Sequence, residues 1–203
     1  MARARHAINK NATNGQNKAA GHIRIIAGQW RGRRLPVTDV VGLRPTTDRV
    51  RETLFNWLMQ EIDGARILDC FSGSGALGFE ALSRYASHAT LLELNNSAAQ
   101  QLKKNAAILN ASNAEIIQGD SLNYLSRPAT TTYDVIFIDP PFRQELYLAT
   151  IEQLQKHGYL AANCWIYIES EAELTHLPVP NDWHLHRQKQ TGQVLSRLYQ
   201  RQA

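Results

Sequence analysis

A glycine-rich segment that follows a predicted strand holds the first residues that could do chemistry. Gly73, Gly75 and Gly78 fit the G-x-G-x-x-G spacing that brings a backbone close to a dinucleotide, and Glu93 follows about 20 residues later. However, Asp69 ends the strand, and three residues separate it from Gly73. Because a carboxylate there repels a pyrophosphate, the segment favours a cationic ligand.

S-adenosylmethionine fits this requirement, since it carries a sulfonium and an ammonium group and no phosphate. We expect the glycines to let the backbone approach its methionine part. Asp69 then faces the ammonium group, and Glu93 accepts from both ribose hydroxyls. Asp120, after a later predicted strand, is a candidate acceptor for the adenine amino group. The simpler alternatives are a tight turn for the glycines and a helix cap for Asp120.

A second motif, Asp139-Pro140-Pro141-Phe142, directly follows a buried-looking strand. The prolines remove two donors, which leaves the Asp139 carboxylate and the Pro140 carbonyl as acceptors. Such a corner suits an exocyclic amino group: both N–H groups are held, the lone pair points at a methyl donor, and Asp139 can take the lost proton. Phe142 offers a face for stacking a planar base. The simpler alternative is a strand that ends at a Pro-Pro turn.

Charge is distributed unevenly along the 203 residues. Residues 1–38 carry eight Lys or Arg and no Asp or Glu, so this part has a net charge of +8 and the remainder −4. Residues 1–21 lack periodicity and predict a disordered basic tail. Residues 22–45 alternate apolar and basic side chains around Trp30, which predicts a hairpin that binds nucleic acid.

Strands alternate with helices through the rest of the chain, which predicts one α/β domain over residues 22–203. A helix starting near Asp48 has Val50, Leu54 and Trp57 on one face. The predicted strands are Arg66–Phe71, Ala89–Leu94, Glu115–Gln118, Tyr133–Ile138 and Trp165–Glu169, and the other predicted helices include Ser97–Asn110 and Glu145–His157. Near-continuous apolar strands indicate a parallel sheet covered on both faces. Trp183–Gln188 and Val194–Gln200 flank Gly192 and predict a final antiparallel hairpin.

Composition excludes several classes of protein. Two cysteines form no disulfide framework, no apolar run is long enough to cross a membrane, and no secretory signal is evident, so we expect a cytoplasmic protein. Cys70 and Cys164 are expected in the core. His184 and His186 lack a third ligand, so we expect no metal.

The glycine loop, Glu93 and the D-P-P-F motif together resemble the class I S-adenosylmethionine-dependent amino-group methyltransferases. Residues 23–33 and 44–52 look like the bacterial RsmD-type 16S ribosomal RNA guanine-N2 methyltransferases. The resemblance covers roughly residues 22–200. It implies a Rossmann-like fold with a seven-stranded, mostly parallel sheet whose last strand is antiparallel. It also implies one guanine near the P-site of the small ribosomal subunit as target, with S-adenosylmethionine as cofactor.

The same resemblance assigns further residues. It places Thr46, Phe71 and Ser121 beside the cofactor. Its RNA-binding residues are Arg24, Arg31, Arg33, Arg34, Arg49 and Arg51. Asn95 stands where an acidic residue is common in the family, so the ribose role stays with Glu93 alone.

Three alternatives remain open. The same chemistry could act on adenine N6 or on protein glutamine. A dinucleotide-dependent oxidoreductase would fit the glycine spacing but lacks a hydride-transfer acid or base. A non-catalytic ribosome-assembly factor could retain the cofactor pocket. Size favours a monomer.

Overall fold

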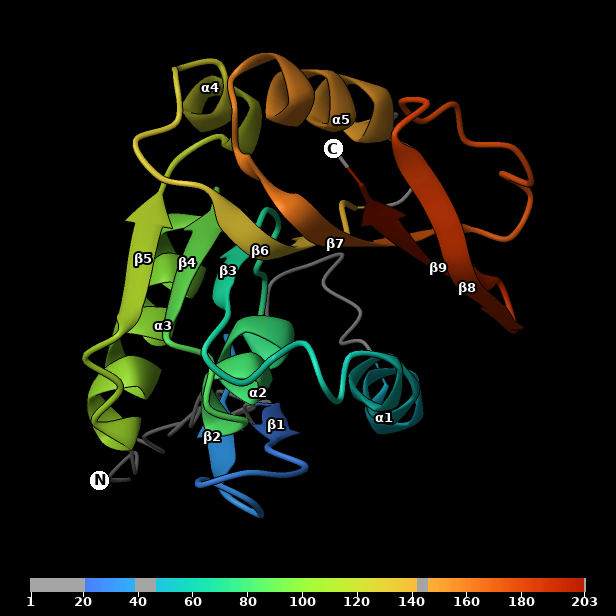
Figure 1. Ribbon diagram of the computed structural model, residues 1–203. Helices are drawn as coiled ribbons and strands as arrows, with labels where there is room; N and C mark the ends of the chain where they lie inside the picture. Colours follow the sequence, from blue (N-terminus) through green and yellow to red (C-terminus); the bar gives the residue numbers. More distant parts are fainter. Residues whose placement is uncertain (1–20, 39–46, 142–145, 203) are drawn as a thin grey trace, which may run out of the picture.

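A computed structural model describes residues 21–38, 47–141 and 146–202. Its centre is a seven-stranded sheet in the order β5-β4-β3-β6-β7-β9-β8 (Figure 1). The strands of this sheet are β3 (Arg66–Asp69), β4 (His88–Glu93), β5 (Ala114–Gln118), β6 (Tyr133–Ile138), β7 (Leu160–Glu171), β8 (Trp183–Thr191) and β9 (Val194–Arg201). Strands β3 to β7 are parallel, and β9 is antiparallel to both β7 and β8. The predicted Rossmann-like sheet with an antiparallel C-terminal hairpin is therefore confirmed.

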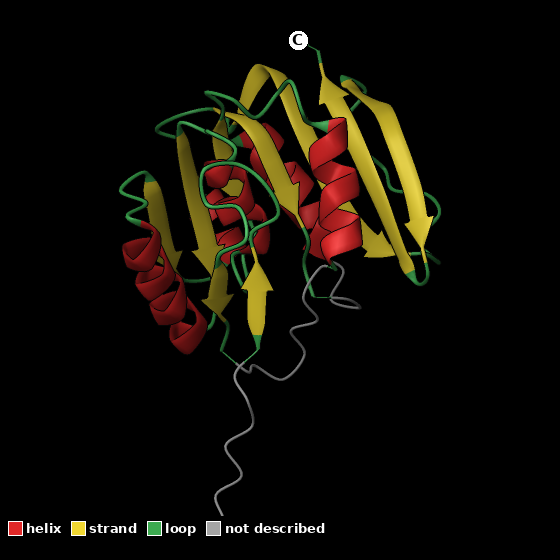
Figure 2. Ribbon diagram, turned by 90° about the horizontal axis from the view of Figure 1, so that it is seen from below, coloured by secondary structure: helices red, strands yellow, loops and turns green. Residues whose placement is uncertain are grey.

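Helices cover both faces of the sheet (Figures 1 and 2). The five helices of the described ranges are α1 (Asp48–Trp57), α2 (Ala76–Ser83), α3 (Asn96–Leu109), α4 (Ser121–Leu125) and α5 (Leu146–Lys156). Apolar side chains of α1, α2 and α3 pack on one face of the sheet in one core cluster, and those of α4 and α5 pack on the other face in a second cluster. Burial on both faces is the physical reason for the near-continuous apolar strands.

A small antiparallel hairpin, β1 (His22–Arg24) and β2 (Arg34–Pro36), lies against α2. The buried Glu80 carboxylate accepts the backbone N–H groups of Ile26 at 2.7 Å and Ala27 at 3.0 Å. The Ser83 hydroxyl accepts from the N–H of Trp30 and donates to the carbonyl of Ala27. These bonds satisfy backbone groups that lie outside regular structure, and they fix the hairpin to the helix that follows the glycine loop.

Element boundaries differ from the predictions where packing decides them. The first central strand ends at Asp69, as expected from the glycine segment, and is two residues shorter than the predicted range Arg66–Phe71, because the next residues turn into the glycine loop. Strand β7 is twelve residues long, since it starts beside Tyr133 of β6 and its residues 165–171 pair with β9 of the C-terminal hairpin. The predicted tail over residues 1–21 lies almost wholly outside the described residues. Within the described ranges, no helix has the length and apolar character needed to cross a membrane.

Candidate active site

The centre of the sheet brings the two predicted motifs together. Strand β3 pairs with β4 on one side and with β6 on the other, so the chain reverses its direction of winding between β3 and β6. Open α/β sheets bind ligands at such a reversal, outside the carboxyl ends of the strands. Asp69 ends β3 and Asp139 follows β6, so both carboxylates lie at this position.

Asp69 is buried, and it forms no ion pair with any of the described residues. Its side chain is 1% exposed, and within the described part of the chain its Oδ2 has no hydrogen-bond partner. Burial, followed by the charge of Asp139, raises the pKa of Asp69 to about 7, although backbone groups of Gly78 and Phe71 act in the opposite direction. A buried carboxylate with an unused oxygen fits a cationic ligand group such as an ammonium.

The glycines shape the loop that carries Asp69 into α2. Gly73 and Gly75 have φ of +50° and +77°, values that favour glycine. A Cβ on Gly75 would lie 2.6 Å from Leu102 and 2.7 Å from Phe79. Gly75 therefore has a packing role whether or not a cofactor binds, whereas Gly73 is partly exposed at the loop.

Glu93 holds this loop from the neighbouring strand. Its Oε2 accepts the Gly73 N–H at 2.8 Å, and its Oε1 accepts the Asn95 N–H at 2.7 Å. Burial raises the pKa of Glu93, and these two N–H groups partly offset the increase. A carboxylate has about four lone-pair sites, so both oxygens retain the capacity to accept a ligand hydroxyl.

Asp120 and Ser121 begin α4 beside this loop. Asp120 is exposed and caps the helix, since its carboxylate accepts the Asn123 N–H at 2.7 Å. Ser121 is buried, and its hydroxyl donates to the Cys70 carbonyl at the end of β3. Ser121 thus connects α4 to the residue that follows β3, and its role at the cofactor stays a prediction.

The D-P-P corner is only partly described. Asp139 is half-buried, Pro140 is buried and Pro141 is exposed. Phe142 and Thr46 lie outside the described residues, so their predicted roles stay predictions.

Two residues of this edge were missed in the sequence. Glu169 is 4% exposed and lies one residue beyond the Ile138–Ile168 pair of β6 and β7, beside Asp139. Burial and the charge of Asp139 raise the pKa of Glu169 to about 8, and the Tyr167 hydroxyl donates to its Oε1 at 2.7 Å. Leu94, directly after Glu93, is an apolar side chain that is 65% exposed. Glu169 is a carboxylate at the end of a predicted strand, as Asp69 is, and this position could have marked it as a candidate site residue.

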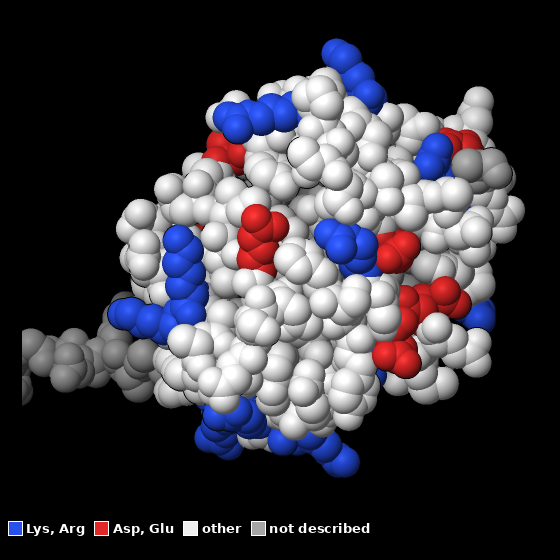
Figure 3. Space-filling view, turned by 60° about the vertical axis from the view of Figure 1, so that its left-hand side comes forward, with Lys and Arg blue, Asp and Glu red and all other residues white. Residues whose placement is uncertain are grey.

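The predicted RNA-binding arginines do not behave alike. Arg24, Arg31, Arg33, Arg34 and Arg49 are all exposed. In Figure 3, Lys and Arg side chains gather along the lower margin of the face, at the level of the β1–β2 hairpin in Figure 1. The prediction that Arg51 binds RNA is wrong, because its side chain is only 1% exposed. It donates to the Asp48 carboxylate at 2.6 Å and to the Arg24 carbonyl at 2.8 Å, so it joins α1 to β1 and is not available to RNA.

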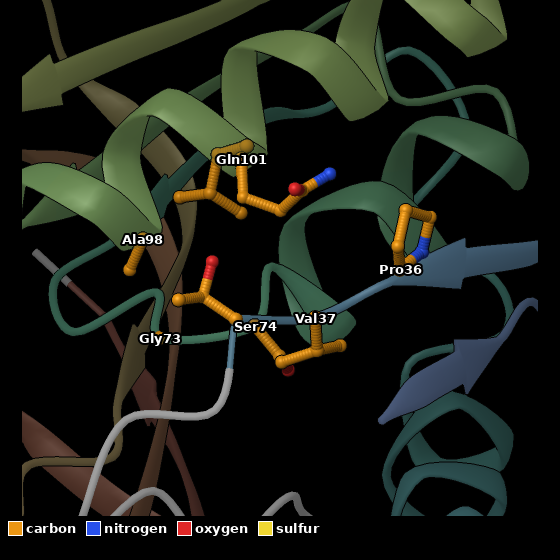
Figure 4. Close-up of a pocket in the computed structure, with 8 residues that line it drawn as sticks. Pro36, Val37, Gly73, Ser74, Ala98 and Gln101 are labelled. Carbon is orange, nitrogen blue, oxygen red and sulfur yellow. The ribbon is translucent and has the colours of Figure 1, made fainter. Parts of the chain in front are cut away.

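A small pocket borders the outer side of the glycine loop (Figure 4). Gly73 and Ser74 of the loop face Ala98 and Gln101 of α3, and the end of β2 with Val37 closes the third side. The loop is therefore enclosed between α3 and the N-terminal hairpin.

The two cysteines lie in the core, as expected. Cys70 and Cys164 are buried, and burial raises the pKa of both thiols, which disfavours a thiolate nucleophile. Trp183 and Tyr199 pack in the second core cluster. Among the described residues, no group of His, Cys, Asp and Glu could hold a metal ion.

Comparison with known proteins decides the family. The model of the family described as Conserved hypothetical protein 95 matches residues 23–200. Ribosomal RNA small subunit methyltransferase D of Escherichia coli is 54% identical over 92% of this chain and 94% of its own. The chain belongs to this methyltransferase family. The Haemophilus influenzae member is 50% identical over 90% of this chain and 95% of its own.

Solved structures agree with this family assignment. An Escherichia coli structure superposes with a TM-score of 0.85 at 56% identity, covering 90% of this chain and 99% of that one. A Haemophilus influenzae structure gives a TM-score of 0.79 at 46% identity, covering 90% of this chain and 100% of that one. The protein is thus a methyltransferase with the expected Rossmann-like fold, and the suggestion of a dinucleotide-dependent oxidoreductase is wrong.

Proposed function

We propose that this methyltransferase moves a methyl group from S-adenosylmethionine to the exocyclic N2 of one guanine in 16S ribosomal RNA. The observation that carries the proposal is the placement of the Asp139–Pro140 acceptors at the centre of the sheet, beside the buried Asp69, whose Oδ2 has no partner among the described residues. The names of the relatives, which specify the ribosomal small subunit, support RNA as the substrate.

The cofactor contacts follow from the charges and positions at this edge. Asp69 faces the ammonium group, Glu93 accepts from the ribose hydroxyls, and Asp120 accepts from the adenine amino group. Leu94 supports the proposal because an exposed apolar side chain beside Glu93 can cover an adenine ring. Gly73 lets the loop approach the methionine part, with Phe71, Ser121 and Thr46 around it.

The reacting nitrogen is held by the chain's own acceptors. S-adenosylmethionine supplies an electrophilic methyl group on a positively charged sulfur. The Asp139 carboxylate and the Pro140 carbonyl accept the two N–H groups of guanine N2, which holds the nitrogen and directs its lone pair. Asp139 then accepts the proton that nitrogen loses as the N–C bond forms and the S–C bond breaks. Phe142 stacks on the base, and the residues need no metal for these steps.

The hairpin arginines are proposed to bind the ribosomal RNA backbone. Arg24, Arg31, Arg33 and Arg34 are exposed on an element that is fixed to α2, so they present charge at a defined distance from the active site. Binding then weakens as salt increases. Arg49 joins this group from α1. We propose that the protein works as a cytoplasmic monomer on the small subunit.

The test is transfer of labelled methyl from S-adenosylmethionine to small subunits that lack their own modifications, followed by nucleoside analysis. We expect one N2-methylguanosine, and Asp139→Ala should reduce kcat by about 100-fold to 10,000-fold while cofactor affinity is retained. Asp63→Ala, at an exposed turn before β3, is the matched control.

Other outcomes distinguish the alternatives. Label in N6-methyladenosine or in protein would keep the methyltransferase and overturn the substrate. No transfer despite cofactor binding would favour the assembly factor.

A further inference from the structure

Strand β8 forms an unusual edge of the sheet. Seven consecutive residues, 184–190, are exposed, although a strand of a covered sheet normally buries alternate side chains. In the described part of the chain no further strand pairs with its outer edge (Figure 2). Residues 183–203 contain no Asp or Glu, whereas β8 itself carries Arg187 and Lys189 together with two histidines.

Register places the basic residues of β8 on the same face as the active-site carboxylates. Lys189 pairs with Ser196 of β9, and Ser196 pairs with Glu169 of β7. Glu169 lies beside Asp139, one residue beyond the Ile138–Ile168 pair. These four side chains therefore form one row across the sheet, and neighbouring strands are about 4.8 Å apart. Three strand spacings separate β8 from β6, so the backbone at Lys189 is about 14 Å from the backbone at Asp139. An RNA strand covers such a distance with a few nucleotides.

Helix α1 connects this strand to the N-terminal hairpin. The Lys189 ammonium group donates to the Thr53 hydroxyl of α1 at 3.3 Å. On the same helix Arg51 donates to the Arg24 carbonyl of β1, so α1 lies between the two basic elements. The exposed part of α1 presents Arg49, and also Glu52, toward solvent.

We propose that β8 is a second RNA-binding surface, on which Arg187 and Lys189 contact the phosphates next to the target nucleotide. This inference rests on the proposed function. Charge complementarity supports it, since β8 carries two cationic side chains and no carboxylate, and Lys189 lies in the row that contains Asp139. A charged edge also prevents pairing with another sheet, and that role requires neither RNA nor proximity to the active site.

The experiment compares two double variants that remove the same charge. Arg187→Gln with Lys189→Gln changes β8, and Arg127→Gln with Lys156→Gln changes two exposed positions away from β8, one after α4 and one at the end of α5. We expect the β8 variant to raise KM for unmethylated small subunits about tenfold or more, with kcat, cofactor affinity and Tm unchanged. The slope of log affinity against log salt should fall by about 1.4–1.8, the value for two lost phosphate contacts. Equal affinities for the two double variants would overturn the inference.

Two further measurements separate this inference from the proposed function. The first is direct binding of the two double variants to ribosomal small subunits, which tests the role of β8 in RNA binding even if no methyl transfer is detected. A photo-crosslinking residue at position 187 should label ribosomal RNA in the native complex. Labelling of a ribosomal protein instead would overturn RNA as the partner of β8.

Discussion

The backbone N–H of Gly73 donates to the Oε2 atom of Glu93 at 2.8 Å, and this bond joins the glycine loop to the end of the neighbouring strand. The other oxygen of Glu93 accepts from Asn95, where α3 begins. One carboxylate therefore fixes two of the segments that surround the proposed cofactor. The loop is held in position before any ligand binds, which reduces the entropy lost on binding.

Glu93→Gln tests this relationship. An amide places an NH2 group opposite one of the two N–H donors, so one charge-assisted bond is lost and the loop is released. We expect cofactor affinity to fall about 10-fold to 100-fold in calorimetric titration. Glu115→Gln makes the same change at an exposed position on adjacent β5 and should bind normally. Unchanged affinity in Glu93→Gln would contradict the ribose role.

Cofactor affinity should depend on pH because of Asp69. Its pKa in the free protein is about 7, and a bound cation favours the ionised form, so binding releases a proton below that pH. We expect affinity to increase by up to about tenfold per pH unit as the pH approaches 7, and then to level off. Calorimetry in buffers with different ionisation enthalpies would count the released proton.

Asp69→Asn is the control for this pH dependence. The variant should bind the cofactor more weakly, and its cofactor affinity should change little with pH. An identical pH profile in the variant would assign the proton to another group.

Glu169 should make the protein less stable as pH rises. Its pKa is about 8 in the folded protein against 4.5 ordinarily, so the folded state binds more protons between these values and stability falls as pH increases through them. The amide of Glu169→Gln resembles the neutral carboxyl but does not titrate. The variant should therefore lack this decrease in the free energy of unfolding, which is up to about 1.4 kcal/mol per pH unit. Denaturation at pH 5 and pH 8 measures the difference. If Glu169→Gln were less stable than the unsubstituted protein at pH 8, the raised pKa of Glu169 would be contradicted.

Ser83→Ala tests the attachment of the hairpin to α2. The hydroxyl accepts the Trp30 N–H at 3.0 Å and donates to the Ala27 carbonyl, so its removal leaves a partly buried N–H and a carbonyl without this partner. We expect a loss of about 1–3 kcal/mol in stability and weaker RNA binding, with smaller changes in cofactor affinity. Ser126→Ala, at an exposed hydroxyl, should change neither. Equal losses of RNA and cofactor affinity would indicate general unfolding.

Local chemistry in the sequence was sufficient for much of this protein. Apolar strands that alternate with helices determine a parallel sheet, because only a sheet covered on both faces buries such runs. Asp69, Glu93 and Asp139 each follow or end a strand, and parallel strands end at one edge, so their convergence was predictable. The cap at Asp120 was likewise foreseen as an alternative.

Strand order and burial of charge were decided only by the tertiary structure. Glu169 lies beside Asp139 because β7 pairs with β6, and no local signal specifies that neighbour. Arg51 has the same charge as the exposed Arg49, yet packing of α1 against β1 and α2 buries it beside Asp48 and Glu80. Sequence periodicity determines which residues share a face of an element. Long-range packing decides which face is covered, and therefore which charges remain available to RNA.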